Sequence, residues 1–498
     1  MAKTGSRLVA VSNRLPITLV RKGDSWTIKP GAGGLVTALA PVLKNRGGLW
    51  IGWSGAALGE DIANKIEPAS KEVGYQLHPV QLTQSEVQDF YHGFSNEVIW
   101  PLFHDLQSRC NFRPRYWYGY LEVNKKFAGV AAKFSNESDF IWVHDYHLMS
   151  MAKALKDLGV QRKTGFFLHI PFPSLDIFLK LPWREQVLRN LLEYDLVGFQ
   201  TMRDRRNFLT CIQRLCPGMK SYGRGAVVRV NVGGREVRVG AFPISIDFDA
   251  FEHQASSRPV ADTAWFLHEA IPERQVILGV DRLDYTKGLP EKFKAFRNAL
   301  ERYPELHKKV TLVQVVVPSR EGVPEYQSLK AEIDRLVGEI NGKFTCSNWV
   351  PIHYLYRSLD RQELLAYYRL AEIALVTPLK DGMNLVAKEY CACNMEGNGV
   401  LILSEFAGAA AQLQTGAILV NPYDVEGVAN AIFRAFTMKM SERRRRMRRL
   451  REVVKRRNIF WWVDSFLHTA LAKHLADFPY TEEEYLPHIE LEEPTPDE

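Results

Sequence analysis

Residues 375–390, LVTPLKDGMNLVAKEY, place charged side chains where an apolar run gives way to a helix-forming stretch. The run ends at a proline, a Lys-Asp-Gly-Met-Asn corner follows, and good helix formers begin at Leu385. The corner supplies the Asp381 carboxylate and the bare backbone of Gly382, and Glu389 lies about one turn into the helix. A carboxylate, backbone N–H groups and a helix start together can bind hydroxyl groups and an anion.

Charged or polar side chains also follow other apolar runs. They occur in the segments VSNRLP (Arg14), WVHDYH (Asp145), FFLHIPFP (His169), GVDRLDYTKG (Arg282, Lys287), VVPSRE (Arg320) and TPLKDGMN (Asp381). A single loop arginine is usually a solvated charge, and a single histidine is usually structural. However, open α/β sheets bind ligands at the carboxyl ends of their strands. Six such loops therefore indicate one ligand site, and their cations suit phosphate groups.

The segment KPGAGGLVTAL is a further candidate for anion binding. Gly31, Gly33 and Gly34 precede a helix-forming stretch from Leu35, so backbone N–H groups can approach an anion closely. A simple tight turn explains the same glycines equally well. The segment lacks the G-x-G-x-x-G fingerprint of dinucleotide-binding folds, which argues against a nicotinamide enzyme.

Short apolar runs typical of buried parallel strands occur in two sets along the chain. The first set is Leu8–Val11, Phe140–Val143, Phe166–Ile170 and Leu196–Phe199, and the second is Val276–Val280, Leu312–Val317, Ile373–Val376 and Leu401–Leu403. Stretches long enough for helices separate most of these runs. Turn residues and a change of character between the sets place a domain boundary near Ser245–Glu252. The sequence therefore predicts two doubly wound α/β domains that face each other across a cleft.

Length and composition limit the class of protein. A chain of 498 residues, 46% of them hydrophobic, can bury at least two cores. No stretch reaches the roughly 18 uninterrupted apolar residues of a membrane span, and the apolar run near the N-terminus is too short for a secretory signal. The six cysteines show no metal-ligand spacing, which favours reduced, buried thiols. We therefore predict a cytoplasmic protein without a membrane segment.

One segment carries the net charge of +7. Ser441–Asn458 holds ten Lys and Arg against two Glu, and subtracting its +8 from +7 leaves −1 for the remainder. Met447, Leu450 and Val454 recur at helical spacing, which predicts an amphipathic helix with a solvated basic face. Nucleic-acid binding is the weaker interpretation, because no nucleic-acid module accompanies the helix. The last 18 residues hold eight acids and no Lys or Arg, and we expect a mobile tail.

Taken in order, these and neighbouring segments resemble one enzyme family. SNRLP, GGL, FYHGFSNEVIWPLFH, WVHDYHL, FFLHIPFPS, YDLVGFQT, RLDYTKGLPEK, DGMNLVAKEY and NPYD are similar to segments of trehalose-6-phosphate synthases, retaining glycosyltransferases with the two-Rossmann-domain GT-B fold. The resemblance runs from about residue 8 to 465. It implies an acceptor-binding domain at 1–248, a nucleotide-sugar-binding domain at 249–457, a helix at 458–478 that packs back on the first domain, and an acidic tail at 479–498.

The resemblance also implies a role for each candidate residue. The donor-binding residues would be Gly33, Gly34, His169, Arg282, Lys287, Asp381, Gly382, Met383, Asn384, Leu385 and Glu389. The acceptor-binding residues would be Arg14 and Arg320, which would hold a phosphate, with Tyr91, Trp100 and Asp145. Of all these, the residues that carry the chemistry would be Asp145, His169, Arg282, Lys287 and Asp381. Asp381 would hold the glucose hydroxyls, Glu389 the ribose, and the two cations would neutralise the leaving diphosphate.

The implied reaction moves α-glucose from a nucleoside diphosphate glucose, with UDP-glucose favoured, to glucose 6-phosphate, giving α,α-trehalose 6-phosphate. The resemblance implies no cofactor and no metal. Two alternatives stay open: a glucosylglycerol-phosphate synthase that uses glycerol 3-phosphate, and a catalytically silent regulator that binds sugar phosphates. The intact GGL segment, Tyr91 and Trp100 count against the first alternative, and the complete set of charged residues counts against the second. The base preference and a homo-oligomeric state also stay open, the former because Leu359 stands where bacterial members would have an aromatic residue.

Two further patterns are interpreted as structural. Asp247–Asp249 is an Asp-x-Asp segment that would indicate a metal in another transferase fold, but between two domains a helix cap or turn is the better interpretation. The aromatic stretch at 90–103 is typical of core, and we assign Phe90, Phe94 and Phe103 to it. Its other aromatic residues enter the site only through the resemblance.

Overall fold

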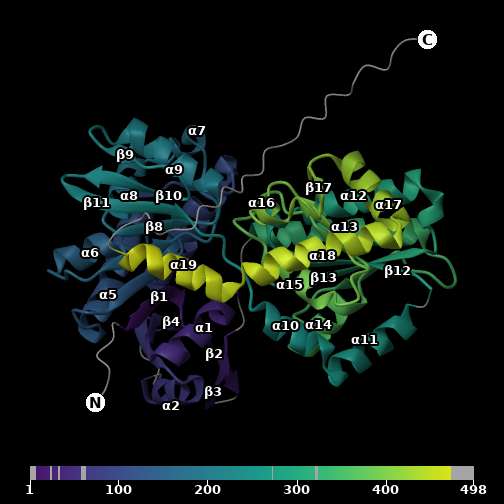
Figure 1. Ribbon diagram of the computed structural model, residues 1–498, viewed down its shortest axis with the longest axis horizontal. Helices are drawn as coiled ribbons and strands as arrows, with labels where there is room; N and C mark the ends of the chain where they lie inside the picture. Colours follow the sequence, from purple (N-terminus) through teal and green to yellow (C-terminus); the bar gives the residue numbers. More distant parts are fainter. Residues whose placement is uncertain are drawn as a thin grey trace, which may run out of the picture.

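The computed structural model describes residues 7–22, 25–31, 34–57, 63–271, 273–319 and 324–472. Two α/β domains lie next to each other, each built on its own sheet (Figure 1). The N-terminal domain contains β1 (Leu8–Arg14), β2 (Ile17–Lys22), β3 (Ser25–Pro30), β4 (Leu49–Ala57), β5 (Gln76–Leu82), β6 (Phe140–His144), β7 (Thr164–Phe167), β8 (Leu196–Phe199), β9 (Lys220–Tyr222), β10 (Val227–Val232) and β11 (Arg235–Ala241). The C-terminal domain contains β12 (Gln275–Arg282), β13 (Val310–Val317), β14 (Ile352–Leu355), β15 (Ile373–Val376), β16 (Val400–Ser404) and β17 (Ile418–Val420).

Helices connect and cover the strands of both sheets. Those of the N-terminal domain are α1 (Gly34–Arg46), α2 (Ala63–Val73), α3 (Gln84–Glu86), η1 (Val87–Ile99), α4 (Trp100–Phe103), η2 (Gln107–Arg109), α5 (Pro114–Phe134), η3 (Tyr146–Leu148), α6 (Met151–Asp157), α7 (Leu175–Phe178), α8 (Arg184–Leu191) and α9 (Met202–Leu215). The rest are α10 (Phe248–Ser256), α11 (Arg258–Ala270), η4 (Tyr285–Lys287), α12 (Leu289–Arg302), η5 (Pro304–Leu306), α13 (Pro324–Phe344), α14 (Arg361–Leu370), α15 (Leu385–Cys393), α16 (Ala410–Leu413), α17 (Val425–Thr437), α18 (Met440–Arg456) and α19 (Ile459–Leu471).

The strand order of both sheets is that of doubly wound folds. The C-terminal sheet runs β14-β13-β12-β15-β16-β17, and the N-terminal sheet runs β5-β4-β1-β6-β7-β8-β11-β10-β9. The order therefore reverses between β12 and β15 in one sheet and between β1 and β6 in the other. All eight predicted apolar runs contribute to strands, although β7 ends at Phe167, three residues before the end of the predicted run.

The last two helices connect the domains. α18 lies against the C-terminal domain, and α19 continues onto the N-terminal domain (Figure 1). The Phe466 ring of α19 stacks on Trp142 of β6 at 4.3 Å between centroids. Gly165 and Gly198 leave room for it, because a Cβ at either position would lie 2.7–2.8 Å from the Phe466 ring. The predicted helix at 458–478 thus has α19 within it, while the domain limits at 248 and 457 stay predictions.

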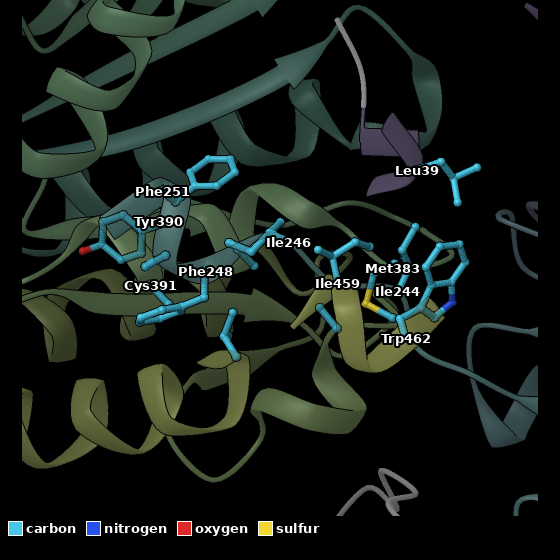
Figure 2. Packing of buried hydrophobic residues seen from close by; sticks show 14 of the residues in the cluster. Leu39, Ile244, Ile246, Phe248, Phe251, Met383, Tyr390, Cys391, Ile459 and Trp462 are labelled. Carbon is cyan, nitrogen blue, oxygen red and sulfur yellow. The ribbon is translucent and has the colours of Figure 1, made fainter. Parts of the chain in front are cut away.

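One hydrophobic cluster runs through both domains. It contains Leu39 of α1, Ile244 between β11 and α10, Met383 of the corner before α15, and Ile459 and Trp462 of α19. Figure 2 shows Ile244, Met383, Ile459 and Trp462 grouped where the two domains meet. Because these residues share one core, the segment between β11 and α10, together with α19, connects the corner before α15 to the N-terminal domain.

The predicted basic helix lies in α18. Met447, Leu450 and Val454 are buried in α18, which confirms the amphipathic helix. Arg443 is also buried, where it donates to the carbonyls of Ala435, Phe436 and Met438, so not every cation lies on the solvated face. Asp247 is the N-cap of α10 and accepts from the Ala250 N–H at 3.0 Å, which confirms the cap.

Phe90, Phe94 and Phe103 are fully buried, as expected. The six cysteines form no disulfide, and four of them are buried while Cys110 and Cys346 are partly exposed. Among the described residues no helix is both long and apolar enough to cross a bilayer. The acidic tail at 479–498 lies outside the described residues.

Candidate active site

In each sheet, charged residues lie at the carboxyl ends of the two strands between which the strand order reverses. Arg14 is the last residue of β1 and Asp145 directly follows β6, while Arg282 is the last residue of β12 and Asp381 follows β15. The charge of Arg282 acts to lower the pKa of the Asp145 carboxyl, which requires the two residues to lie close together. The strand ends of the two sheets therefore face each other. The fold therefore assembles one site from loops about 130 and 100 residues apart within each domain, as open α/β sheets predict.

A partly buried ion pair forms the corner before α15. The Lys287 ammonium lies 2.6 Å from Oδ2 of Asp381, and their side chains are only 12% and 16% exposed. Burial acts to raise the pKa of Asp381, but Lys287 outweighs it and the pKa lies below its usual range. Asn384 donates its amide to Asp381 at 3.2 Å and caps α15 by accepting from the Ala387 N–H. Asp381 is therefore charged and held in place at neutral pH.

The loop before α16 supports the backbone of this corner. The Gly408 N–H donates to the Asp381 carbonyl at 3.0 Å, and the Ala409 N–H donates to the Met383 carbonyl at 2.7 Å. A Cβ at Gly408 would lie 1.9 Å from the Gly382 carbonyl oxygen, so only glycine allows this approach. The corner is thus fixed by main-chain contacts that a sequence pattern does not reveal.

Further into α15, the Glu389 carboxylate is hydrogen-bonded to a tyrosine. The Tyr368 hydroxyl donates to its Oε2 at 2.8 Å. Burial raises the pKa of Glu389 above its usual range. Leu385 is the first residue of α15, so it lies at the positive end of the helix dipole.

The two domains touch at the mouth of the site. Gly382 packs on the backbone of His169, and a Cβ at Gly382 would lie 2.1 Å from the His169 carbonyl oxygen. Two side-chain contacts also join the domains, an ion pair between Lys380 and Asp105 and the Arg109 guanidinium 4.8 Å from the Tyr285 ring. The cleft is therefore closed at this point. Closure on substrate binding, with hinges near 245–252 and 455–460, stays a prediction.

Asp145 and His169 lie on the N-terminal side of this contact between the domains. Asp145 has φ 74°, an uncommon backbone conformation for a residue with a side chain, and its Oδ1 accepts from the His169 N–H at 3.2 Å. Burial raises the pKa of Asp145 to about 7. Burial also lowers the pKa of His169 to about 3, so this imidazole is neutral at physiological pH.

His144 is a neighbour that the sequence analysis missed. Its Nδ1 lies 3.2 Å from Nε2 of His169, and burial lowers the pKa of His144 well below its usual value. Both rings are therefore neutral, and of these two nitrogens one donates and the other accepts. His144 is the last residue of β6, where the apolar run ends, and the available signal was its place in WVHDYH.

Arg14 is held by aromatic rings. Its guanidinium carbon lies 4.0 Å from the ring centroid of Trp53 and 5.7 Å from that of Tyr91. A Cβ at Gly55 would lie 2.0 Å from Nη1 of Arg14, so this glycine leaves space for the cation. Trp53 and Gly55 lie in β4, which no apolar run predicted. The structure thus joins Arg14 with Tyr91, as expected, and adds two residues from β4.

Trp100 is buried and lies next to His104, a second histidine that the sequence did not indicate. The Trp100 ring is 5.8 Å from Tyr146 and 4.3 Å from His104, whose Nδ1 lies 2.7 Å from the Trp100 carbonyl. Burial lowers the pKa of His104 to about 4, and the charges of Lys287 and Asp381 also act on it. A neutral imidazole from the N-terminal domain therefore lies close to the ion pair of the C-terminal domain.

The four remaining candidates are Arg282, Gly34, Gly33 and Arg320. Arg282 is exposed at the end of β12, and Gly34 begins α1. Gly33 and Arg320 lie outside the described residues, so their predicted roles are carried only as proposals. Within the described part of the chain, no three His, Cys, Asp or Glu side chains are grouped as a metal ion would require.

The whole described chain, including both halves of this site, matches one family of known proteins. The profile described as Glycosyltransferase family 20 matches residues 6–472. This chain belongs to glycosyltransferase family 20. The trehalose-6-phosphate synthase of Mycolicibacterium vanbaalenii is 42% identical to it over 475 residues, which cover 94% of this chain and 96% of that protein.

Solved structures of family 20 relatives have the same fold. A UDP-forming α,α-trehalose-phosphate synthase from Burkholderia xenovorans, in complex with glucose-6-phosphate, matches with a TM-score of 0.84 and 35% identity, covering 93% of this chain and 100% of that one. A structure from E. coli bound with UDP-2-fluoro glucose matches with a TM-score of 0.84 and 38% identity, covering 93% and 99%. The predicted GT-B fold, an α/β fold with two doubly wound domains facing across a cleft, is confirmed.

The Asp145 carboxyl of this family 20 chain should make folding stability depend on pH. Its pKa is raised to about 7 in the folded protein, above the value of about 3.9 in an unfolded chain. Because the folded state holds this proton more tightly, its contribution to the free energy of unfolding falls as pH rises from about 4 to about 7. We expect Asp145→Asn to remove this part of the slope in chemical denaturation between pH 4 and 8.

A second variant checks the cause. The positive charge of Arg282 lowers the pKa of Asp145, so Arg282→Met should move the carboxyl titration to higher pH, as followed by ¹³C NMR of the carboxyl carbon. An unchanged stability slope in Asp145→Asn would contradict the raised pKa.

Proposed function

We propose that this chain transfers α-glucose from UDP-glucose to the anomeric hydroxyl of glucose 6-phosphate, giving α,α-trehalose 6-phosphate and UDP. The observation that carries the proposal is the match over more than nine tenths of the chain with a trehalose-6-phosphate synthase and with a relative solved with glucose-6-phosphate. The E. coli relative bound with UDP-2-fluoro glucose supports a UDP-glucose donor. A cytoplasmic location and a homo-oligomeric state are further parts of this proposal.

The donor is proposed to bind at the corner before α15. Asp381 accepts hydrogen bonds from the glucose hydroxyls, with the backbone of 382–384 beside it. Glu389, further along α15, accepts hydrogen bonds from the ribose hydroxyls. The start of α15 at Leu385 faces the diphosphate. In support, Asp381 is charged and fixed by the Lys287 ion pair, whose ammonium has further protons to donate to a phosphate oxygen.

The acceptor is proposed to bind on the N-terminal side of the cleft. Arg14 binds the 6-phosphate, and the rings at 53 and 91 hold its guanidinium in position. Tyr91, Trp100 and Asp145 surround the sugar, and Arg320 provides the second cation for the phosphate. A phosphate held by two guanidinium groups explains why glucose 6-phosphate would be preferred over glucose.

The proposed chemistry breaks the bond between the glucose anomeric carbon and the diphosphate oxygen. The acceptor hydroxyl attacks the same face, and its proton passes to the leaving phosphate oxygen, so no protein nucleophile is required. Lys287 and Arg282 stabilise the negative charge that develops on the diphosphate. Asp145 orients the acceptor, and neutral His169 donates or accepts a hydrogen bond at the donor glucose without adding a charge.

The substrates are tested by one matrix of assays. UDP-, ADP- and GDP-glucose are each supplied with glucose 6-phosphate and with glycerol 3-phosphate, and the products are measured by mass spectrometry. The proposal expects UDP-glucose with glucose 6-phosphate to give the largest kcat/KM. Preference for glycerol 3-phosphate would identify a glucosylglycerol-phosphate synthase instead, and binding without turnover in any pair would identify a regulator.

The acceptor assignment gives a separate prediction. Arg14→Ala should raise the KM for glucose 6-phosphate about 10- to 100-fold, because a hydrogen bond to a charged group contributes roughly 1.5–3 kcal/mol. Arg320→Ala is expected to behave alike, and UDP binding should stay near wild type in both variants. Arg115→Ala is the control, since Arg115 is exposed and forms an ion pair with Asp89 away from the proposed site residues. Equal loss of UDP binding would contradict the assignment of either arginine.

A further inference from the structure

A pocket lies between the two domains, behind the donor corner. Its walls come from the start of α9, the end of β11, α16 with the loop before it, and the connection from α18 to α19. The space among its lining residues is about 530 Å³ when the adjoining open solvent is included. None of the candidate donor or acceptor residues is among its described lining residues. The pocket is therefore separate from the proposed substrate sites.

One buried side chain of the pocket has an unused hydrogen-bond donor. Gln412 is 6% exposed, and its Oε1 accepts from the Lys388 ammonium at 2.7 Å. An ammonium can only donate, so the amide oxygen of Gln412 must face Lys388 and its NH₂ group the other way. Nε2 of Gln412 is buried and has no hydrogen-bond partner in the described parts of the chain. Such a donor indicates an acceptor atom supplied from outside the chain.

The electrostatics of the pocket favour an anion. Arg457, 8% exposed, lines it, and the described lining residues include no carboxyl group. α9 has 14 residues and begins at Met202, so Gln200–Met202 place the positive end of its dipole at the pocket. The rest of the wall is mainly apolar, including Phe242 and Trp461. A cation, an amide donor and a helix start among apolar side chains suit a compact oxyanion.

Hydrogen bonds join this pocket to the donor corner. Gly408, in the wall, donates to the Asp381 carbonyl. Lys388, which precedes Glu389 in α15, donates both to Gln412 and to the Ile244 carbonyl at 2.7 Å. The Ile244 N–H in turn donates to Gln200 on the opposite wall at 2.9 Å. A ligand that contacts both walls would therefore stabilise the arrangement in which the two domains are closed around the donor.

We propose that this pocket binds a compact oxyanion, a carboxylate or a phosphate, and that its occupation tightens donor binding at the Asp381 corner. The proposal that an oxyanion binds depends only on the residues of the pocket. The effect on the donor rests on the proposed function.

Binding is tested by isothermal titration calorimetry of the full chain with sodium acetate and with inorganic phosphate. UDP and glucose 6-phosphate are kept saturating, so that both proposed phosphate-binding positions of the active site are occupied. Gln412→Glu is the key variant, because a carboxylate still accepts from Lys388 while it replaces the NH₂ donor with a negative oxygen. Gln414→Glu makes the same charge change two residues later, outside the described lining, and is the matched control.

The expected result is saturable binding of at least one probe to wild type and Gln414→Glu, weakened at least tenfold in Gln412→Glu. Ala411→Phe should also lose binding, because Ala411 lines the pocket and the larger ring fills it without touching the hydrogen bonds. Acetamide, the neutral counterpart of acetate, should not bind. Whichever of acetate and phosphate binds more tightly identifies the class of oxyanion. Equal affinity of wild type and Gln412→Glu, or no binding of either probe to wild type, would overturn the proposal.

The effect on the donor is read from the KM for UDP-glucose with the same probes at constant ionic strength. Wild type should show at least a twofold lower KM at saturating probe, and Gln412→Glu should show no change. Binding in calorimetry with an unchanged KM in wild type would overturn the coupling to the donor. If turnover is absent altogether, the proposed function has failed, and the calorimetric comparison of the two Gln→Glu variants still decides on the pocket.

Discussion

Asp381→Asn is expected to lower kcat/KM for UDP-glucose by about 100-fold or more, while the protein stays folded. The asparagine keeps the shape of the side chain but loses the charge that pairs with Lys287 at 2.6 Å. One charged hydrogen bond to the donor contributes roughly 1.5–3 kcal/mol, and the upper end of this range corresponds to about 100-fold. Lys287 also loses the partner that holds it at the proposed diphosphate position, which should add to the effect on the transition state.

Lys287→Met should have a similar effect, and the two changes should not be additive. Each single variant already breaks the pair, so the double variant should lose less than the product of the two single losses. Steady-state kinetics on the four proteins gives the coupling directly. Simple additivity would show that the two residues act independently, against the assignment of the pair to one donor site.

A second buried ion pair in the same domain is the control. Lys292 of α12 lies 2.5 Å from Asp281 of β12, and both side chains are almost fully buried. Breaking a buried pair by removing one partner costs about 3–5 kcal/mol of folding stability. Asp281→Asn should therefore lower the melting temperature clearly more than Asp381→Asn does, with a smaller effect on the KM for UDP-glucose. The comparison separates loss of a ligand contact from loss of stability.

The sequence could predict elements whose signal is local. Runs such as Leu196–Phe199 and Ile373–Val376 are strands with the same bounds in the structure, because strands buried on both faces are apolar throughout. β4, LWIGWSGAA, mixes glycine and serine with its tryptophans and lacks such a run, so Trp53 and Gly55 were missed with it. β10 and β11, VVRVNV and REVRVGA, carry charges between apolar residues because they extend the edge of the sheet.

Of the candidate site, the sequence could predict only the charged residues in the loops that follow strands. Arg14, Asp145, Arg282 and Asp381 could be expected together, because strand ends of a parallel sheet meet at one edge. His104 could not, since it lies near the ion pair only through the approach of the other domain. His144 is a histidine at the end of an apolar run, where a structural role is the usual one. The approach of one particular residue to another across the two domains, such as that of His104 to the ion pair, has no signature in a single sequence.

Gly382 is the clearest contact of this kind, and its replacement tests the closed cleft. A Cβ at this position would lie 2.1 Å from the His169 carbonyl oxygen and 3.0 Å from the Ile170 Cα. These are backbone atoms, so no side chain can rotate away, and the two domains must separate. Gly382 is not among the glycines with positive φ, so alanine is allowed by its own backbone conformation. The effect should therefore come from the domain contact and not from local strain.

Gly382→Ala is expected to lower kcat about 100-fold, because a displacement of about 1 Å at the reacting atoms can cost that much. UDP binding should fall less, since the proposed donor contacts come mainly from one domain. Gly408→Ala provides the contrast: its Cβ would lie 1.9 Å from the Gly382 carbonyl within the C-terminal domain, so UDP binding itself should weaken. Gly338→Ala, in α13 with no atom within 4 Å of the new Cβ, should keep full activity. X-ray scattering with both substrates bound should show a larger radius of gyration for Gly382→Ala than for wild type. Wild-type kcat in Gly382→Ala would mean that catalysis does not require the domains to meet at His169.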